Sequence, residues 1–298
     1  MTMRMTAAPF DAIADTYDES FSDSSIGRAQ RRVVWMETDR TFRAGQRILE
    51  INCGTGIDAL HLAHRGVAVL ACDASPRMIA VARGRLARSS ACAPVDFRCI
   101  PTERIASIEI EARYDGVFSN FAGLNCVSDL RRTACDLARF VKPGGKAIFC
   151  VFSRLCLWET IFYLSGANLK KAFRRFTRNG VVAALSDDSS VLVHYPTIRQ
   201  LQEMFSRYFR LESWKGIGVA VPPSYLEHLA VRFPRWFEFA ARIENRGPPD
   251  AIGSAALVDM PVQPERRLVA FDGRAHSCAA HGNHRRPSKR RARLEIRR

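Results

Sequence analysis

The sequence predicts an α/β fold built on a doubly wound, mostly parallel sheet, and three observations support this prediction. Short β-rich runs alternate with helical patterns between residues 46 and 152, as in chains of βαβ units. A glycine turn at residues 53–56 joins the first β-rich run to the first helical pattern. The longest apolar runs, such as residues 147–152, fall far short of the ~20 residues that cross a bilayer, so no transmembrane helix is expected.

The first half of the chain predicts five strands separated by helices. The helix after the glycine turn stops at Gly66, a residue that suits a left-handed helix end. The next helix begins at Ser75 and Pro76, which favour the N-cap and the first helical position. A third helix, over residues 128–141, ends at a Lys-Pro-Gly-Gly turn. The predicted strands are residues 47–52, 67–73, 95–100, 114–120 and 146–152.

After residue 152 the regular alternation ends. Residues 153–194 combine an apolar, aromatic stretch with a basic one, and we interpret them as a helical cap inserted between strands five and six. Residues 195–205 predict a helix, 209–221 contain a strand, and 222–244 are again largely helical. The aromatic residues of the insertion, Trp158, Phe162 and Tyr163, are expected to pack in the core. Its basic stretch, residues 170–178, is expected to form a helix face that contacts solvent.

The chain divides into three predicted parts. Residues 1–45 form an N-terminal helical lid, residues 46–245 form a domain with its cap insertion, and residues 246–298 form a tail. The tail carries twelve Arg or Lys residues against five Asp or Glu, and its composition predicts disorder or the product of a shifted reading frame. Residues 266–272 are its one convincing strand candidate, and they are expected to fill the last position beside strand five.

Composition also bears on partners and location. The net charge of +15 raises nucleic acid as a possible partner, but nearly half of this excess lies in the tail, which is where such binding is expected. The nine cysteines form no CxxC pair and have no histidine at metal-like spacing. We therefore expect no metal site, and a reducing cytoplasm as the location.

Polar residues at the ends of the first two strands predict a site for a nucleotide-like cofactor. Glu50 lies at the end of strand one. The turn that follows contains Asn52, Gly54 and Gly56, and the helix N-terminus behind it offers free N–H groups. Asp73 ends strand two, where an acid accepts hydrogen bonds from ribose hydroxyls. The turn also satisfies the dinucleotide pattern G-x-G-x-x-[GA]. Glu50 would oppose a pyrophosphate and suits a ligand with an ammonium group, but both cofactor classes stay open on these residues alone.

Four motifs in chain order, together with the segment that precedes them, resemble the class I S-adenosylmethionine-dependent methyltransferases, in particular their small-molecule branch of types 11 and 25. EINCGTG is similar to the acidic glycine motif of the family, CDAS to its ribose-binding acid, YDGVFSNF to its fourth-strand motif and VKPGG to its turn before strand five. FDAIADTYDESF resembles the helix that precedes the sheet. The resemblance covers roughly residues 10–221. It implies a Rossmann-like fold with a seven-stranded sheet, and S-adenosylmethionine as the cofactor.

The resemblance also implies where the cofactor is held, with two departures from the family pattern. Asn52 stands in place of the first glycine, and asparagine tolerates a positive φ better than most residues. Pro101 and Thr102 stand where the family often has an acid that contacts adenine, which leaves Thr102 or Glu103 for that role. Asp115 is expected to be structural. The implied cofactor-binding residues are Tyr17, Glu50, Asn52, Cys53, Gly54, Gly56, Asp73, Ala74, Met78, Thr102, Asn120 and Phe121, and Asp15 joins Tyr17 in closing over the cofactor.

The activity implied by the resemblance is methyl transfer to a small, hydrophobic metabolite by in-line displacement, with catalysis mainly by proximity. His194 and Glu159 are the candidate bases if the acceptor is a hydroxyl. Three alternatives stay open: a nucleic-acid (RNA) methyltransferase, a nicotinamide oxidoreductase and a non-catalytic S-adenosylmethionine-binding protein. SNFAGLN follows strand four in place of an [ND]PP[YF] motif, which argues against an adenine-N6 enzyme. The acceptor atom and the oligomeric state are not set by these patterns.

Overall fold

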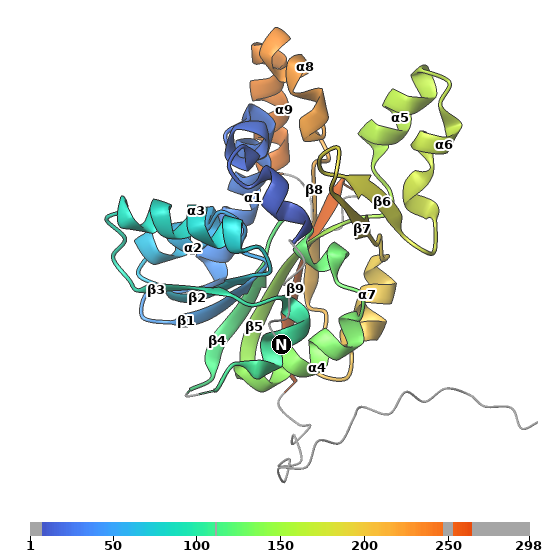
Figure 1. Ribbon diagram of the computed structural model, residues 1–298. Helices are drawn as coiled ribbons and strands as arrows, with labels where there is room; N and C mark the ends of the chain where they lie inside the picture. Colours follow the sequence, from blue (N-terminus) through green and yellow to red (C-terminus); the bar gives the residue numbers. More distant parts are fainter. Residues whose placement is uncertain (1–7, 111, 247–252, 264–298) are drawn as a thin grey trace, which may run out of the picture. The chain divides into compact units, whose positions relative to one another are not determined.

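A seven-stranded sheet forms the centre of the computed structural model, which describes residues 8–110, 112–246 and 253–263 (Figure 1). The strand order is β3-β2-β1-β4-β5-β9-β8. The first five strands pair in parallel, whereas β9 is antiparallel to both of its neighbours. The strands are β1 (Arg47–Ile51), β2 (Ala68–Asp73), β3 (Val95–Cys99), β4 (Tyr114–Ser119), β5 (Val141–Phe152), β8 (Ser213–Ile217) and β9 (Ala255–Pro261). The doubly wound, mostly parallel sheet predicted from the sequence is confirmed.

Helices cover both faces of this sheet (Figure 1). On one face, Val34 and Leu62 join the same buried cluster as Ile48 of β1. On the other face, Leu137 and Phe205 share a cluster with Leu49. Successive residues of β1 thus point to opposite faces, which explains why apolar Ile48 and Leu49 are adjacent in the sequence and do not alternate with polar residues. The covering helices are α1 (Ser25–Thr41), α2 (Ile57–His64) and α3 (Pro76–Ala87) on the first face, and α4 (Leu130–Phe140) and α7 (Ile198–Phe205) on the second.

The last strand of the sheet corrects the sequence prediction. β9, residues 255–261, lies between β5 and β8, although these residues were assigned to the tail. The prediction gave this position to residues 266–272, which lie outside the described residues. Burial on both faces explains the difference: Ala255, Leu257 and Met260 are almost completely buried. In the sequence these seven residues stand between glycine-rich and proline-rich segments, so the local pattern does not indicate a buried strand.

The insertion after β5 is only partly helical, so the predicted helical cap is not confirmed in that form. Its second half is an antiparallel hairpin in which β6 (Val181–Ala184) pairs with β7 (Ser190–Val193). The β-branched valines of both strands favour a strand over a helix. Its first half holds α5 (Leu157–Ser165), α6 (Leu169–Ala172) and the 3-10 turn η5 (Arg174–Phe176).

A second helical segment connects β8 to β9. It consists of η6 (Ser224–Leu226), α8 (Glu227–Arg232) and α9 (Pro234–Arg246), in agreement with the helical prediction for residues 222–244. Figure 1 shows α5, α6, α8 and α9 extending away from the carboxyl edge of the parallel strands. Among the described residues, no helix is long and apolar enough to cross a membrane.

Short turns border the same edge of the sheet. At the N-terminus, η1 (Pro9–Ile13) and the π-turn η2 (Asp18–Ser22) precede α1. After β3 and β4 follow η3 (Thr102–Ser107) and η4 (Gly123–Cys126). η3 and η4 therefore lie where the parallel strands β3 and β4 end, which is the usual position of ligand sites in such sheets.

Candidate functional site

The β1–α2 turn forms the floor of the candidate site. It lies beside the end of β4, at the switch point where the chain continues to opposite sides of β1. Asn52, Gly54 and Gly56 all have positive φ, of 57°, 53° and 75°. The expectation that asparagine would keep the turn in place of glycine is therefore confirmed. Gly123 approaches the Asn52 side chain so closely that a Cβ there would lie 2.2 Å from the Asn52 Cβ.

The two turn glycines differ in their surroundings. A Cβ on Gly54 would meet nothing within 4 Å, so its side faces open space. A Cβ on Gly56 would lie 2.6 Å from the Phe97 ring and 2.8 Å from the Ala82 Cβ. Gly54 thus leaves room for a ligand to approach the backbone, whereas Gly56 is required for the packing of α2 against β3 and α3.

Gly56→Ala is expected to lower the free energy of unfolding by about 2–4 kcal/mol, because left-handed strain adds to overpacking of the core. The matched control is Gly45→Ala, since Gly45 also has a positive φ of 86° but has nothing within 4 Å of its Cβ position. The control should lose only about 1 kcal/mol. Urea denaturation of both variants measures the difference, and equal losses would contradict the packing role of Gly56.

Asp73 connects the end of β2 to the turn. Its Oδ2 accepts a hydrogen bond from the Gly54 amide at 2.9 Å, and its Oδ1 accepts one from the Ser75 amide at 2.8 Å. Burial raises the pKa of this carboxyl group, although the backbone hydrogen bonds act in the opposite direction. A carboxylate has about four acceptor positions, so Asp73 keeps acceptor capacity for a ligand hydroxyl group.

Two buried polar atoms of the site lack a hydrogen-bond partner in the described part of the chain. They are Glu50 Oε2 and Thr102 Oγ1, on residues that are 1% and 3% exposed. Burial, together with the charge of Asp58, raises the pKa of Glu50 well above its usual value. Buried polar groups are normally paired. A ligand with a positive charge near Glu50 and a polar ring edge near Thr102 would satisfy both atoms, and S-adenosylmethionine has both features.

A buried network that the sequence reasoning missed lies beside the turn. Asp58, in the first turn of α2, accepts hydrogen bonds from Arg31 Nη1 at 2.5 Å, from Asn120 Nδ2 at 2.9 Å and from Trp35 Nε1 at 2.7 Å. The Arg31 guanidinium group also lies 4.7 Å from the centroid of the Phe121 ring. The network joins α1, α2 and the end of β4. No sequence motif indicated it, because Arg31 lies on a helix that the sequence placed only within a lid.

Three aspartates of the N-terminal segment hold it over the site through hydrogen bonds and ion pairs. Asp11 accepts a hydrogen bond from Ser75 Oγ at 2.5 Å, and Asp15 forms an ion pair with Arg77. Asp18 accepts a hydrogen bond from Thr55 Oγ1 at 2.8 Å and pairs with Arg85. All the partners belong to the turn or to α3, so residues 9–23 lie across the cofactor motif. Asp11 and Asp18 had not been identified from the sequence.

Aromatic residues make the inner surface of this segment. Phe21 packs edge-to-face on Phe121, with ring centroids 4.9 Å apart, and Tyr17 lies 5.7 Å from Phe21. Burial and the charges of Asp58, Asp18 and Asp73 raise the pKa of Tyr17 to about 12, against an opposing effect of Arg31. The Tyr17 hydroxyl group therefore keeps its proton at neutral pH and can donate a hydrogen bond. Phe121 adopts a φ of 40°, an uncommon conformation that brings its ring to this position.

The other implied cofactor residues occupy less direct positions. The Cys53 side chain is buried, and its S–H group donates to the Gly54 carbonyl at 3.8 Å. Met78 is buried beneath the first turn of α3, where its amide donates to Ser75 Oγ. Ala74 is exposed next to Asp73. Of these three residues, only Ala74 presents its side chain to solvent, so Cys53 and Met78 form the packing beneath the site.

The two candidate bases differ sharply. Both Glu159 oxygens accept hydrogen bonds from arginines, Oε1 from Arg174 at 2.7 Å and Oε2 from Arg175 at 2.6 Å. Burial opposes ionisation of Glu159, but the two arginines together lower the pKa of its carboxyl group. Glu159 is therefore a poor base, and its ion pairs stabilise the insertion. His194 follows β7, and its amide donates to the Asn125 carbonyl at 2.7 Å, beside the end of β4. Only His194 therefore stays a candidate base.

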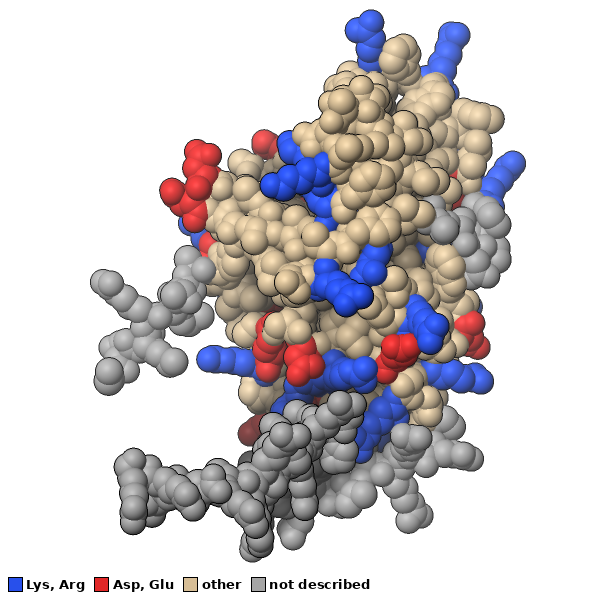
Figure 2. All heavy atoms as spheres, turned by 90° about the vertical axis from the view of Figure 1, so that its right-hand side faces the viewer, with Lys and Arg blue, Asp and Glu red and all other residues tan. Residues whose placement is uncertain are grey.

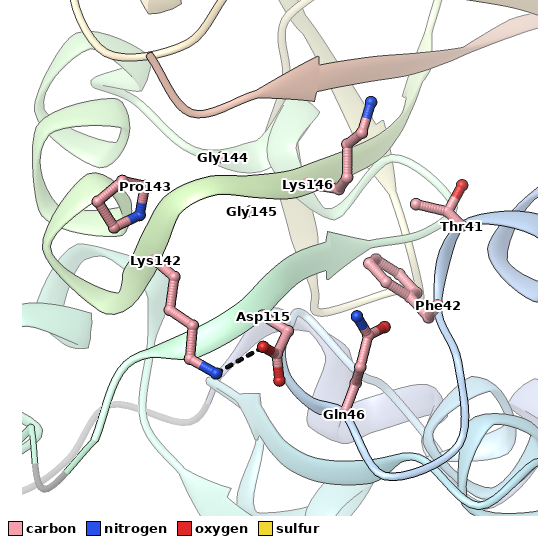
Figure 3. Close-up of a pocket in the computed structure, with 9 residues that line it drawn as sticks. All are labelled: Thr41, Phe42, Gln46, Asp115, Lys142, Pro143, Gly144, Gly145 and Lys146. Carbon is pink, nitrogen blue, oxygen red and sulfur yellow. Dashed lines mark hydrogen bonds and ion pairs between the residues drawn. The ribbon is translucent and has the colours of Figure 1, made fainter. Parts of the chain in front are cut away.

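Asp115 lies at the opposite end of the sheet. It accepts hydrogen bonds from the Arg47 amide at 2.9 Å and from Lys142 Nζ at 2.6 Å, and the Lys142 interaction lowers its pKa despite partial burial (Figure 3). The pocket around it has a volume of about 210 Å³, below the ~300–1,000 Å³ of typical ligand pockets. Asp115 therefore holds the amino ends of β1, β4 and β5 together, as expected for a structural residue.

Comparisons with known proteins show a methyltransferase domain in the first half of the chain. A family model described as a methyltransferase domain matches residues 48–145, which include the glycine turn and Asp73. A demethylmenaquinone methyltransferase of Tropheryma whipplei (strain Twist) is 29% identical over 242 residues, covering 76% of this chain and 90% of that protein. A protein of the same name from Clavibacter sepedonicus is 34% identical over 152 residues, covering 49% of this chain and 58% of that protein.

Solved structures agree on the fold. A putative S-adenosylmethionine-dependent methyltransferase from Listeria monocytogenes has a TM-score of 0.54 at 19% identity, covering 78% of this chain and 97% of that chain. A DhpI complex with SAH also has a TM-score of 0.54, at 16% identity, covering 86% of this chain and 94% of that chain. These two structures agree with this chain in fold. The matched methyltransferase domain and the named relatives support a class I S-adenosylmethionine-dependent methyltransferase, an enzyme with S-adenosylmethionine as its cofactor.

Proposed function

We propose that this enzyme methylates a small, hydrophobic molecule. The observation that carries the proposal is the group of aromatic rings gathered beyond the carboxyl edge of the sheet. Trp158 of α5 contacts Trp236 of α9 with ring centroids 5.8 Å apart, and Tyr225 lies 6.1 Å from Phe162 and 6.4 Å from Tyr163. Aromatic side chains with few polar groups line sites for apolar ligands. The relatives named above act on demethylmenaquinone, so this is the first acceptor to test.

In this proposal the cofactor residues have separate roles. Asp73 accepts hydrogen bonds from the ribose, the Thr102 hydroxyl pairs with the polar edge of the base, and Gly54 allows close approach to the backbone. Glu50 faces the positively charged amino acid portion. S-adenosylmethionine, when bound, supplies a methyl group already activated by its sulfonium charge.

The enzyme's own residues then orient the reactants and exclude water. Tyr17, Phe21 and Phe121 cover the site with apolar surface, and alignment of acceptor and methyl group supplies most of the rate. If the acceptor loses a proton, His194 is the side chain to remove it. Loss of turnover in His194→Ala with unchanged cofactor affinity would support that role, and unchanged turnover would contradict it.

Turnover on defined acceptors tests the proposal. Purified enzyme is incubated with S-adenosylmethionine and short-chain demethylmenaquinone, other apolar phenols, or RNA, and products are identified by mass spectrometry. A methylated apolar product supports the proposal. Turnover on RNA alone would establish a nucleic-acid enzyme instead, and cofactor binding without turnover on any acceptor would favour a non-catalytic protein.

Glu50→Gln is expected to change stability and cofactor binding in opposite directions. The folded-state pKa of Glu50 is raised above its usual 4.5, so ionising it costs stability as the pH rises above that value. Glutamine has no such cost, so the variant without cofactor should unfold at a higher temperature at pH 7 and show little difference at pH 4.5. Its affinity for S-adenosylmethionine should fall about tenfold or more, because a charged hydrogen-bond acceptor is lost.

Thermal unfolding with and without cofactor measures both effects. Glu109→Gln is the matched control, since Glu109 is an exposed glutamate to which no cofactor contact is assigned. A variant that loses stability in the absence of cofactor, or that binds it as tightly as the parent, would argue against Glu50 as the partner of the positive charge.

A further inference from the structure

Exposed apolar side chains are concentrated on one part of the molecule. Among the described residues, every large hydrophobic side chain with high exposure, except Ile110, belongs to residues 157–243. Five of them are more than 60% exposed: Ile161, Leu169, Val182, Val231 and Phe239. These exposed residues are Leu157, Ile161, Phe162 and Leu164 of α5, Leu169 of α6, Phe173 and Phe176 near η5, Val182 and Leu192 of the hairpin, Tyr225 of η6, Val231 and Phe233 of α8 and its end, and Trp236, Phe239 and Ile243 of α9.

These side chains belong to one region. The contact of Trp158 with Trp236, and that of Phe162 with Tyr225, join the insertion to the α8–α9 segment. We call the exposed surface of α5, α6, η5, β6, β7, α8 and α9 the cap face. Soluble proteins rarely expose contiguous apolar patches of this kind unless the patch binds a protein, a membrane or a ligand.

The charges on the cap face indicate which of these it binds. Exposed cations lie among the apolar side chains: Lys170, Lys171 and Arg178 in the insertion, and Arg232, Arg235 and Arg242 on α8 and α9. Figure 2 shows the upper part of the molecule as a broad area of uncharged side chains with Lys and Arg projecting from it, and with red side chains at its left edge.

Several carboxylates of the same elements are withdrawn from the surface. Glu159 is buried under two arginines. Glu244 is 2% exposed and accepts hydrogen bonds from the four amides of residues 218–221. Glu227 accepts from the amides of Ser25 and Ile26 at the start of α1. Asp187, Asp188 and Glu238 are the acidic residues exposed on these elements, so the cap face is positively charged.

We propose that the cap face docks on the surface of an anionic lipid bilayer. Short helices that carry Trp, Phe and Leu together with Lys and Arg match the composition of segments that lie in the membrane interface. The cations would meet lipid phosphates while the apolar side chains enter the acyl boundary. Because the cap face adjoins the carboxyl edge of the sheet, docking would bring the site to an apolar acceptor dissolved in the bilayer. The proposal goes beyond the methyl transfer proposed above and does not depend on the identity of the acceptor.

Vesicle sedimentation with the full chain tests the proposal. The parent enzyme should bind vesicles of phosphatidylglycerol and phosphatidylcholine, and bind pure phosphatidylcholine vesicles much more weakly. A variant combining Ile161→Ser, Leu169→Ser, Val231→Ser and Phe239→Ser should bind anionic vesicles at least about tenfold more weakly. These four side chains are 61–70% exposed, so their replacement leaves the core intact. Ile110→Ser, on the exposed hydrophobic outside the cap face, should bind like the parent.

A charge variant distinguishes vesicle binding through the cap face from vesicle binding through the basic C-terminal residues. Lys170→Glu/Arg178→Glu should weaken binding to anionic vesicles, whereas Arg113→Glu/Arg139→Glu, at exposed cations elsewhere, should not. The last 14 residues hold eight Arg or Lys, and binding through them would survive both cap variants. Equal vesicle binding by the parent and both cap variants would therefore overturn the proposal. The proposal would also be overturned if the parent enzyme did not bind vesicles but formed a dimer, and the variant with four serine substitutions were a monomer.

Cofactor affinity, measured on the same proteins, keeps this proposal separate from the proposed function. The cap variants should bind S-adenosylmethionine as the parent does and methylate a detergent-dispersed acceptor. Failure of vesicle binding with intact turnover would reject only the membrane proposal, and failure of turnover with intact vesicle binding would reject only the proposed acceptor class.

Discussion

Asp73→Ala should weaken the binding of S-adenosylmethionine by at least about a hundredfold, the largest effect on affinity that we expect from a single substitution. The carboxylate anchors the amides of Gly54 and Ser75 and is the acceptor that we assign to the ribose. Each hydrogen bond to a charged group contributes roughly 1.5–3 kcal/mol. Loss of the ribose contacts would be accompanied by loosening of the glycine turn, so two sources of affinity disappear together.

Titration calorimetry on the purified variant measures this effect. Asp96→Ala is the control, because Asp96 is an exposed aspartate on the adjacent strand that pairs with Arg98 at 2.7 Å. Asp73→Asn should give an intermediate loss, since it retains one oxygen. Undiminished affinity in Asp73→Ala would show that the cofactor is held elsewhere, and it would remove the basis for the roles given to Glu50 and Thr102.

Arg31→Met should lower the free energy of unfolding by about 3–5 kcal/mol, because it leaves the buried Asp58 carboxylate without its cation. Both side chains of the pair are at most 7% exposed. Methionine is close in length to the aliphatic part of arginine, so lost packing contributes little. The variant should also bind the cofactor less well, since the network holds Asn120 and Phe121 beside the turn.

Chemical denaturation of two further variants shows whether burial is the cause. Arg199→Met removes an exposed ion pair with Glu203, formed at 3.0 Å, and should change stability by less than about 0.5 kcal/mol. Adding Asp58→Asn to Arg31→Met should restore part of the loss, because the unpaired charge is then absent. A loss in Arg31→Met no larger than that in Arg199→Met would mean that the Arg31–Asp58 pair adds nothing beyond a surface pair.

The parts of the fold that could be predicted are those set by local sequence. The central strands β1 and β2 are mostly apolar because both of their faces are covered. The helix that starts at Ser75 and Pro76 has its signals within four residues. The positive φ of Asn52 was also foreseeable, because few other residues adopt it readily.

The parts that could not be predicted depend on contacts between distant residues. Arg31 and Asp58 meet only after α1 packs beside α2, so neither residue carries a local sign of the pair. β9 is a strand because β5 and β8 supply hydrogen bonds on both of its sides. Glu159 had the residue type of a base, but its neighbouring arginines remove its basicity. In each case tertiary structure decides what the residue does.

The position of β9 has a consequence for synthesis of the protein. A strand near the end of the described chain lies inside the sheet, so β5 and β8 cannot be joined until residue 261 has emerged from the ribosome. Until then, the nascent chain presents an unpaired apolar strand edge, a state in which chains aggregate or need a chaperone. A stop codon placed at residue 246 to remove the basic C-terminal residues would leave translation products in that state permanently, whereas one placed after residue 263 would retain the whole sheet.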